Sequence, residues 1–446
     1  MSSTITAIAT ASGVGSIAII RVSGKDALNI AKKITHKSNF NPREATLTYL
    51  YNNNDELIDQ AIVIYFKAPN SFTGEDIVEF QCHGGSVIAQ EILDSIIGFG
   101  AVLAKPGEFT QRAFLNGKID LSKAEAIAKM IETKSVDGAK VLARQLKGEL
   151  KEFIDSTRDS LLSLLAYSEV MIDYAEEDIP NNTLDKLKTS LLKVKKDLEQ
   201  IVKSSLRRKG IIEGFVLSIV GKPNVGKSSI LNKMLNYERA IVSDIAGTTR
   251  DSIEEVIKIG THLVRVADTA GIRDAKDSIE KLGVERSLKW LNSSDIVIAV
   301  FDLSKEFDSE DEKVLHLIKD IKDSKVIVVL NKIDLEKKIN IEIFKDFDIV
   351  KISAKESVES LIEKIEEILN SFSSNDELML ISNRQIDSVK KALYEINSAI
   401  MPLDNLELEF FSYHINGAIE ALNEITKPYT HEELLDKMFG EFCLGK

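Results

Sequence analysis

The nine residues GKPNVGKSS at positions 221–229 constrain this chain more than any other stretch. They match G-x-x-x-x-G-K-[ST], follow the apolar run FVLSIV and open a helical pattern, which is the context that a phosphate-binding loop requires. Gly221 and Gly226 allow backbone N–H groups to turn toward phosphate oxygens. Lys227 supplies a charge to the β- and γ-phosphates, and the Ser228 hydroxyl is a Mg²⁺ ligand. The stretch predicts an α/β domain with a nucleotide site at the end of a strand.

Three later motifs predict which nucleotide binds. DTAG ends the run LVRVAD, NKID follows KVIVVL, and SAK follows IVKI. Asp334 is expected to accept the two guanine donors and Asn331 to fix the base; adenine lacks the paired N1–H and N2–H donors, so GTP is predicted. The predicted GTP-binding residues are Asn224, Val225, Gly226, Lys227, Ser228, Ser229, Ser243, Asp244, Ile245, Ala246, Gly247, Thr248, Thr249, Asp268, Thr269, Ala270, Gly271, Asn331, Lys332, Asp334, Ser353, Ala354 and Lys355.

The two switch segments of such a domain can also be located. SDIAGTTRD, residues 243–251, lies where a first switch is expected, and Thr249 within it is a second candidate Mg²⁺ ligand. The residue after DTAG is Ile272, where a Ras-type enzyme has the glutamine that orients the attacking water. An apolar side chain cannot orient water. Another group is therefore expected to do so, and the acidic residues within reach are Asp274, Asp277 and Glu280.

The pattern of the chain changes along its length. Residues 1–118 alternate short β-rich runs with helical stretches, residues 119–210 are helical, residues 211–374 alternate strands and helices, and residues 375–446 are helical again. This predicts a small N-terminal α/β domain and a discontinuous helical bundle, into which a doubly wound, mostly parallel GTPase domain is inserted. Two independent bundles would give the same pattern.

Composition excludes several other classes of protein. The formal charge of −13 argues against a broad, nonspecific nucleic-acid surface, although a local basic site remains compatible with it. Two cysteines, Cys82 and Cys443, cannot form a disulfide framework, and no apolar run has the length of a membrane span. We therefore expect a cytoplasmic protein. The terminal FCLGK is not favoured as a lipid anchor, because Gly445 is not aliphatic and Lys446 is not a usual final residue.

Several longer motifs resemble the MnmE (TrmE) family of bacterial and organellar tRNA modification GTPases, over the whole chain. The matching stretches are PNSFTGEDIVEFQCHGG, KPGEFTQRAFLNGKIDLSKAEAI, GKPNVGKSS, DIAGTTRD, DTAGIRD and FCLGK. The resemblance implies a potassium-activated GTPase that forms a homodimer across its G domains. It implies Glu280 as the catalytic residue that positions water, and K⁺ ligands at Asn224, Ser243, Ile245 and Thr248. Ser243 departs from the expected Thr, but the loop ligands are largely backbone oxygens.

The same resemblance implies a folate-binding N-terminal domain and a reaction. Arg21, Glu79, Lys118 and Lys446 fall at positions that bind 5-formyltetrahydrofolate; the first three would otherwise be interpreted as salt-bridge or surface residues. The implied reaction forms a carboxymethylaminomethyl or aminomethyl group on C5 of the wobble uridine of certain tRNAs, with a methylene from a tetrahydrofolate derivative (5-formyl- or methylene-tetrahydrofolate). FAD and NADH are expected on a partner subunit, MnmG (GidA). Cys443 is either a catalytic thiolate or proton donor, or a residue that packs the tail.

Two other classes of function remain as alternatives. Similar phosphate-loop and DTAG motifs occur in regulatory and ribosome-assembly GTPases, which carry out no modification chemistry. The acidic balance and the N-terminal block around Arg21, Glu79 and Lys118 argue against that class. A membrane-associated switch would require a lipid on Cys443. We expect no membrane partner.

Overall fold

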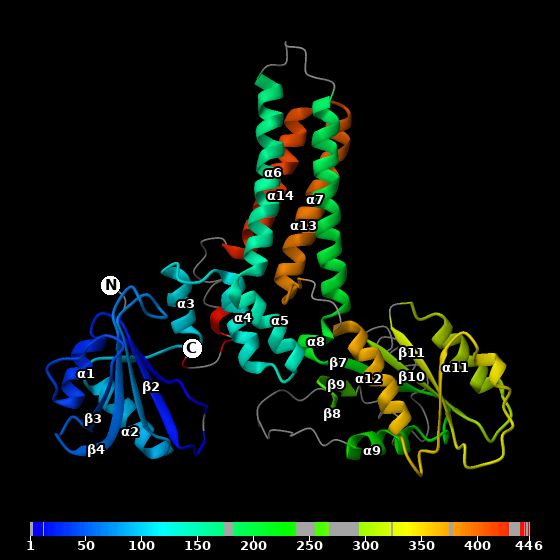
Figure 1. The fold of residues 1–446 in the computed structure, drawn as a ribbon, viewed down its shortest axis with the longest axis horizontal. Helices are drawn as coiled ribbons and strands as arrows, with labels where there is room; N and C mark the ends of the chain where they lie inside the picture. Colours follow the sequence, from blue (N-terminus) through cyan, green and yellow to red (C-terminus); the bar gives the residue numbers. More distant parts are fainter. Residues whose placement is uncertain are drawn as a thin grey trace, which may run out of the picture. The chain divides into compact units, whose positions relative to one another are not determined.

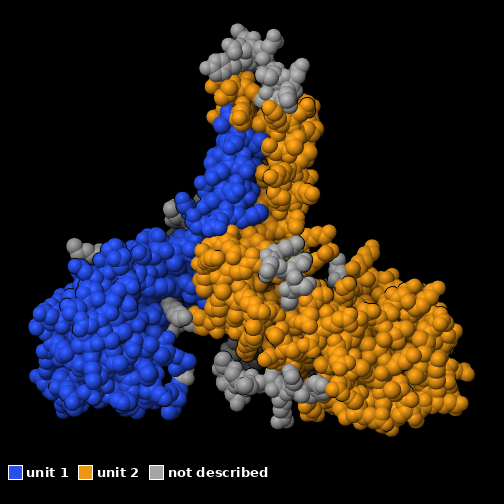
Figure 2. Space-filling model, in the orientation of Figure 1, with its two compact units in different colours: residues 1–128, 151–166, 412–446 blue, residues 129–150, 167–411 orange. Residues whose placement is uncertain are grey.

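The computed structural model describes residues 3–11, 13–173, 182–237, 255–266, 294–322, 324–373, 378–427, 438–440, 442 and 445. The chain forms two compact units (Figure 2). Unit 1 comprises residues 1–128, 151–166 and 412–446, and unit 2 comprises residues 129–150 and 167–411. Each unit is therefore assembled from stretches that are separate in the sequence. The two units do not have the same boundaries as the four segments predicted from the sequence. The boundaries of the predicted domains stay predictions.

Unit 1 contains a six-stranded sheet in the order β3-β4-β5-β2-β1-β6. Its strands β2, β3 and β4 are labelled in Figure 1. Its pairs are antiparallel except for β1 and β6. The helices α1 (Ala27–Thr35) and α2 (Ser86–Gly98) share one core with the sheet, so strands such as β2 alternate buried and less buried residues. A third helix, α3 (Glu108–Leu115), follows β6. The strands are β1 (Ile5–Ile8), β2 (Ile17–Ser23), β3 (Ala45–Tyr51), β4 (Leu57–Phe66), β5 (Ile77–His83) and β6 (Val102–Leu103).

Unit 2 contains a second six-stranded sheet, in the order β12-β11-β10-β7-β9-β8. Its pairs are parallel except for the hairpin β8–β9, as the alternation of strands and helices predicts. Every residue of β10 is buried, because α9 and α12 pack on one face of the sheet while α11 and the 3₁₀ helix η2 pack on the other. The strands are β7 (Phe215–Val220), β8 (Glu255–Ile259), β9 (His262–Val266), β10 (Ile296–Asp302), β11 (Lys325–Asn331) and β12 (Asp348–Ile352); the helices are α9 (Lys227–Tyr237), α11 (Ser309–Lys319), η2 (Ile341–Phe344) and α12 (Glu359–Ser373).

The remaining helices come from the chain between β6 and β7 and from the chain after α12, and several of them are long (Figure 1). In α7, Leu187, Leu191 and Leu198 recur on one face and are buried, and α13 packs against α7 in unit 2. Among the described helices, none is long and apolar enough to cross a membrane. These helices are α4 (Leu121–Glu132), α5 (Val136–Lys147), α6 (Glu149–Asp173), α7 (Asn182–Arg207), α8 (Gly210–Glu213), α13 (Asn383–Asp404) and α14 (Leu408–Thr426).

Candidate functional site

The phosphate-loop residues 221–229 connect β7 to α9, at the carboxyl edge of the parallel sheet, where ligands of such folds bind. Gly221 and Gly226 have φ values of 149° and 106°, which glycine adopts far more readily than other residues. A Cβ on Gly221 would also collide with the carbonyl oxygen of Val300 in β10. A Cβ on Gly226 would collide with the side-chain amide of Asn331. Close packing therefore requires both glycines, in addition to their backbone conformation.

The ammonium group of Lys227 is bonded within its own loop. Its Nζ donates hydrogen bonds to the carbonyl oxygens of Gly221 and Lys222, each at 2.7 Å. Burial lowers the pKa of Lys227. Phosphate oxygens are charged acceptors and bind an ammonium more strongly than neutral carbonyls do. A nucleotide phosphate is therefore expected to compete successfully for this ammonium.

Asn331 joins the phosphate loop to the SAK loop. Its side chain is buried at the end of β11. Nδ2 donates a hydrogen bond to the Val225 carbonyl at 2.7 Å, and Oδ1 accepts one from the Ala354 N–H at 2.9 Å. Both functions of the amide are used, so an aspartate could not replace it without losing the donor. Three motifs that are widely separated in the sequence are thus brought together by one side chain.

Lys332 ties the same region to an aspartate that the motifs did not predict. Its Nζ lies 2.6 Å from Oδ2 of Asp302 and 3.1 Å from the carbonyl oxygen of Asn224. Burial raises the pKa of Asp302, but hydrogen bonds from Lys332 and Ser304 outweigh burial and hold that pKa below its usual value. The sequence did carry one indication of this residue. Asp302 ends the strand-like run DIVIAVFD, and its strand ends at the same sheet edge as those that precede the other motifs.

The residues predicted to contact the guanine base lie at the same edge. Asp334 and Lys355 are exposed, whereas Ser353 and Ala354 are buried. The Ile333 N–H donates to the carbonyl oxygen of Ile352 at 3.3 Å, which attaches the NKID loop to the end of β12. An exposed carboxylate on a fixed loop can accept hydrogen bonds from a ligand. The geometry therefore agrees with Asp334 as a base-binding residue, a role that stays a prediction.

Lys222 anchors the phosphate loop to α11, a contact that the loop motif did not predict. Its Nζ lies 2.6 Å from Oδ2 of Asp308 and 2.6 Å from Oδ2 of Asp311. The two aspartates form a capping box at the start of α11. Burial alone would lower the pKa of Lys222, but hydrogen bonds to both carboxylates raise it; the bond from Lys222 is the main reason that the pKa of Asp308 falls to about 2. We call Lys222, Asp308 and Asp311 the lysine clamp.

Several predicted site residues lie outside the described residues, and their roles remain predictions. They include the whole first switch, the DTAG motif, the proposed water-positioning residue and two residues of the tail. These residues are Ser243, Asp244, Ile245, Ala246, Gly247, Thr248, Thr249, Asp268, Thr269, Ala270, Gly271, Glu280, Cys443 and Lys446.

In unit 1, Arg21 of β2 lies directly opposite Glu79 of β5. The Arg21 Nη2 and Nε atoms lie 2.8 and 2.9 Å from Oε1 of Glu79. The guanidinium lies 5.8 Å from the ring centre of Phe72 and 5.7 Å from that of Phe109. The side chains of the pair are 19% and 15% exposed, so a ligand can reach them. The structure shows a salt bridge between Arg21 and Glu79, which agrees with the interpretation of these residues as salt-bridge or surface residues, and a folate role stays a prediction.

Lys118 meets the same loop as Arg21. The Lys118 Nζ donates to the carbonyl oxygen of Pro69 at 2.8 Å. Pro69 and Phe72 belong to the connection between β4 and β5, and Phe72 contacts Arg21. Arg21 and Lys118 therefore contact one loop of unit 1, and Glu79 is joined to Arg21 by the salt bridge.

The tail residues that the structure describes also pack within unit 1. Phe439 is 1% exposed and shares a small core with Leu121 and Ala124 of α4. Gly445 has a φ of 89°, and a Cβ there would lie 2.5 Å from the carbonyl oxygen of Ile8, at the end of β1. Since β1 pairs with β2, the tail reaches the strand next to the one that carries Arg21. This position of the tail agrees with the resemblance, which places Lys446 among the folate-binding residues together with Arg21.

The resemblance implies two metal ions beside the phosphate loop, Mg²⁺ and K⁺. Among the described residues, no group of three or more His, Cys, Asp or Glu side chains could hold a metal ion. Nucleotide-bound Mg²⁺ needs few protein ligands, because phosphates and water complete its shell. The exposed Ser228 at the start of α9 is chemically suited to such a role. Asn224, which is exposed with a φ of 63°, offers an amide oxygen suited to K⁺.

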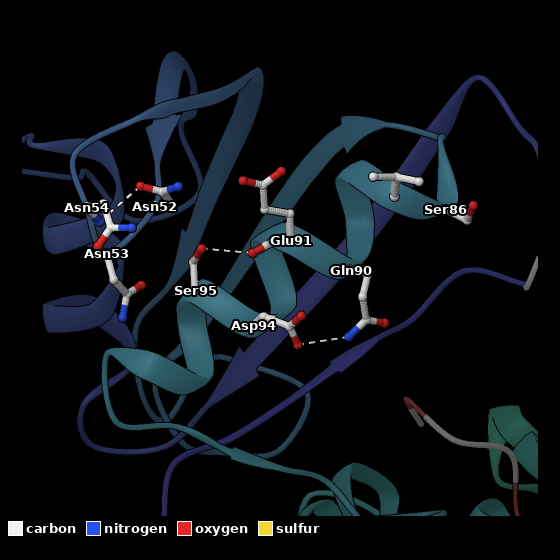
Figure 3. Close-up of a pocket in the computed structure, with 9 residues that line it drawn as sticks. Asn52, Asn53, Asn54, Ser86, Gln90, Glu91, Asp94 and Ser95 are labelled. Atoms are coloured by element: carbon white, nitrogen blue, oxygen red, sulfur yellow. Dashed lines mark hydrogen bonds between the residues drawn. The ribbon is translucent and has the colours of Figure 1, made fainter.

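A cavity of about 720 Å³ lies between the β3–β4 hairpin and α2 (Figure 3). None of the predicted site residues lines it. Gln90 donates to Asp94 at 2.8 Å, and Ser95 donates to the Glu91 carbonyl at 2.8 Å (Figure 3). The carboxylates of Glu91 and Asp94 would repel a nucleotide or the glutamate of a folate. This cavity is therefore not one of the predicted sites, because other residues line it and its carboxylates do not suit an anionic ligand.

Two family models match nearly the whole chain. The model of the GTP-binding protein TrmE N-terminus matches residues 4–118, and that of the MnmE helical domain matches residues 121–443. The chain belongs to the MnmE family. This confirms the resemblance found from the motifs. The two models also give the chain an N-terminal domain and a helical domain.

Full-length relatives in the MnmE family are similar to this chain throughout. The tRNA modification GTPase MnmE of Sulfurovum sp. is 59% identical over 446 residues, which cover 100% of this chain and 99% of the relative. Those of Sulfurimonas denitrificans and Aliarcobacter butzleri are 58% and 55% identical, each over 99% of both chains. Among solved structures, the G domain of the T. maritima FeoB iron transporter aligns with 36% of this chain and 98% of its own length, at 24% identity and with a TM-score of 0.27.

Proposed function

We propose that this chain is a potassium-activated GTPase that acts with a FAD- and NADH-dependent MnmG partner on tRNA. Together they form the 5-carboxymethylaminomethyl or aminomethyl group on the wobble uridine of certain tRNAs. Membership of the MnmE family supports the coarser activity, GTP hydrolysis in tRNA modification. The proposal that the chain binds GTP rests chiefly on Asn331, whose side chain is hydrogen-bonded to both the phosphate loop and the SAK loop.

For hydrolysis, the proposal assigns one role to each group around the phosphates. Ser228 and Thr249 would hold Mg²⁺, and Asn224, Ser243, Ile245 and Thr248 would hold K⁺. A K⁺ ion beside the phosphates supplies positive charge for the transition state. Asn224 supports this, because Lys332 fixes its backbone while its side chain is exposed. Glu280 would orient the attacking water, since Ile272 cannot.

For the modification, we propose a tetrahydrofolate derivative bound by Arg21, Glu79, Lys118 and Lys446 in a homodimer. The guanidinium and the two ammonium groups suit the glutamate tail and carbonyl oxygens of a folate, and a carboxylate suits the donor edge of a pterin. The common loop of Arg21 and Lys118 supports this assignment. Cys443 is proposed as a thiolate or proton donor beside the one-carbon unit.

Nucleoside analysis of total tRNA from a deletion strain tests the proposed function. We expect the wobble modification to disappear and to return when the wild-type chain is supplied. A chain with Lys227→Ala should fail to restore it, because the phosphates lose their ammonium partner. Lys233→Ala is the matched control, since Lys233 is a half-buried lysine of α9 whose Nζ donates to the Glu356 carbonyl, outside the phosphate loop. Intact modification in the deletion strain would instead favour a regulatory or ribosome-assembly GTPase.

A further inference from the structure

The hairpin β8–β9 connects the two switch segments. β8 begins at Glu255, soon after the first-switch stretch 243–251, and β9 ends at Val266, just before DTAG. The strands are paired from Glu255 opposite Val266 to Ile259 opposite His262. At about 3.3 Å per residue, the tip lies roughly 15 Å from the ends that join the switches. Because the ribbon is paired along its length, a displacement of its switch ends is expected to move its tip.

The tip of this hairpin is held by one carboxylate of α5. Thr261 Oγ1 donates a hydrogen bond to Oδ2 of Asp137 at 2.9 Å. The Nδ1 atom of His262 lies 3.9 Å from the same oxygen. Asp137 lies in the first turn of α5, after the N-cap Ser135, where the helix dipole favours a negative charge. All of these residues belong to unit 2. We call Asp137, Thr261 and His262 the hairpin latch.

Within the latch, Thr261 is hydrogen-bonded to Asp137, whereas the imidazole of His262 lies near Asp137 without a hydrogen bond to it. The ring is completely buried and lies edge-on to Phe215 of β7, with 5.7 Å between ring centres. Its Nε2 lies 2.9 Å from Oδ1 of Asn370 in α12, an acceptor, so Nε2 carries a proton. Nδ1 faces Asp137 and has no hydrogen-bond partner among the described residues. A buried nitrogen without a partner costs free energy, so the contact with Asp137 is sensitive to small shifts of the tip.

The surroundings of the latch hold its two sides firmly. Burial raises the pKa of Asp137, but hydrogen bonds from Lys140 and Thr261 outweigh burial and lower it, so the carboxylate is charged at neutral pH. A Cβ on Gly138 would lie 2.8 Å from the carbonyl oxygen of Ile211, so α5 packs closely on α8. A Cβ on Gly260 would collide with the Glu366 side chain of α12. The α5 side of the latch is therefore packed on α8, and the hairpin side is packed on α12.

We propose that Asp137 is a positioning residue for GTP hydrolysis, which acts through Thr261 and His262 to couple the β8–β9 hairpin to α5. In this view the nucleotide acts on the switches, the switches act on the hairpin, and the latch passes the displacement to the helical segment that begins at α5. The inference goes beyond the proposed function, because it requires only GTP hydrolysis and not potassium, folate or MnmG.

The test uses the full chain and three variants of the latch. Thr261→Val removes the hydroxyl at nearly constant volume, Thr261→Ser keeps it, and Asp137→Asn removes the charge that faces His262. Asp404→Asn is the control, because Asp404 forms a similar pair with Lys188 at 2.6 Å in another part of unit 2. Two quantities are measured for each chain: kcat and KM for GTP, and hydrogen exchange of residues 136–147 with GDP and with a non-hydrolysable GTP analogue.

We expect α5 of the wild type to exchange differently with the two nucleotides. Thr261→Val should abolish that difference in α5 while keeping it in β8–β9, and should lower kcat roughly fivefold with little change in KM. Asp137→Asn should behave likewise, and Thr261→Ser should behave as the wild type. Thr261 is exposed, so the valine variant is expected to fold even if Asp137→Asn does not. A nucleotide-dependent difference in α5 that persists in Thr261→Val, that is missing from the wild type, or that is lost equally in Asp404→Asn would overturn the proposal.

Discussion

Asn224 combines a left-handed backbone, with a φ of 63°, and an exposed amide in the middle of the phosphate loop. Asparagine tolerates this conformation better than most residues other than glycine. A glycine would be the simpler choice if only the backbone mattered. The side chain therefore has a use of its own, and K⁺ coordination is the one that we propose.

This use predicts a dependence of hydrolysis on the monovalent cation. At equal ionic strength, kcat for GTP should be at least tenfold higher in KCl than in NaCl, because the removal of one group that stabilises transition-state charge typically costs about 10²–10³ in rate. Asn224→Gly should reduce the ratio toward one while GTP binding, measured by calorimetry, changes little. Equal rates in the two salts would count against the potassium site.

The lowered pKa of Asp308 in the lysine clamp predicts how the stability of the protein changes at low pH. Its pKa falls from 3.8 to about 2, chiefly through the hydrogen bond from Lys222, so its contribution to stability is present above about pH 3.8 and is lost as the pH falls through about 2. Asp308→Asn keeps an N-cap residue but removes the charge. The wild type should be slightly more stable than the variant at pH 5, by an amount that is small because Asp308 is exposed to screening.

Thermal unfolding of both chains at pH 5 and at pH 2.5 measures this effect. The difference in Tm between wild type and Asp308→Asn should shrink at the lower pH. Glu310→Gln, an exposed acidic neighbour in the first turn of α11, is the control for general loss of negative charge. A difference that grows toward low pH would show that the clamp is not the source of the lowered pKa.

At the scale of elements, the short helical stretch 438–440 in the tail depends on one aromatic side chain. Phe439 is 1% exposed and contacts Phe114 and Phe442, with ring centres 6.2 and 5.1 Å away. Phe439→Ala should cost about 3–5 kcal/mol of local packing, as truncation of a buried Phe typically does.

Limited proteolysis with mass analysis of the C-terminus checks this prediction. The Phe439→Ala chain should lose its last residues much faster than the wild type, while the rest of the chain is cut at an unchanged rate. Phe410→Ala is the matched control, because Phe410 is 61% exposed in α14. Equal tail protection in the two variants would mean that Phe439 does not hold the tail.

The strands, the helices and the loops at the sheet edge could be predicted from the sequence more readily than the side-chain contacts between them. Strand-like runs followed by GKPNVGKSS, NKID and SAK place those loops at one edge, because parallel strands end together. The lysine clamp and the hairpin latch were not predictable in this way. Lys222 and Asp137 pair with residues far along the chain, through packing that no periodicity marks. Arg21 and Glu79 could be interpreted as a salt bridge, but their register required the sheet.

At the scale of the whole molecule, the formal charge of −13 bears on tRNA binding. Binding to a polyanion is driven by lysine and arginine contacts that release counterions. We therefore expect the chain alone to bind tRNA weakly, at least tenfold less tightly than the complex with MnmG that we propose, at the same salt concentration. Fluorescence titration of labelled tRNA at several salt concentrations measures both affinities. Tight binding by the chain alone, with a steep salt dependence, would place the main tRNA surface on this subunit.

The small core formed by Leu121, Ala124 and Phe439 has a consequence for synthesis. At about 5–20 residues per second, a ribosome needs roughly 20–90 s to make the 446 residues of this chain. The strands of unit 1 emerge near the start of that interval, whereas Phe439 is made only after the sequence of unit 2, which ends at residue 411. Unit 1 is thus begun before unit 2, and its small core around Phe439 cannot close until all of unit 2 has been synthesised.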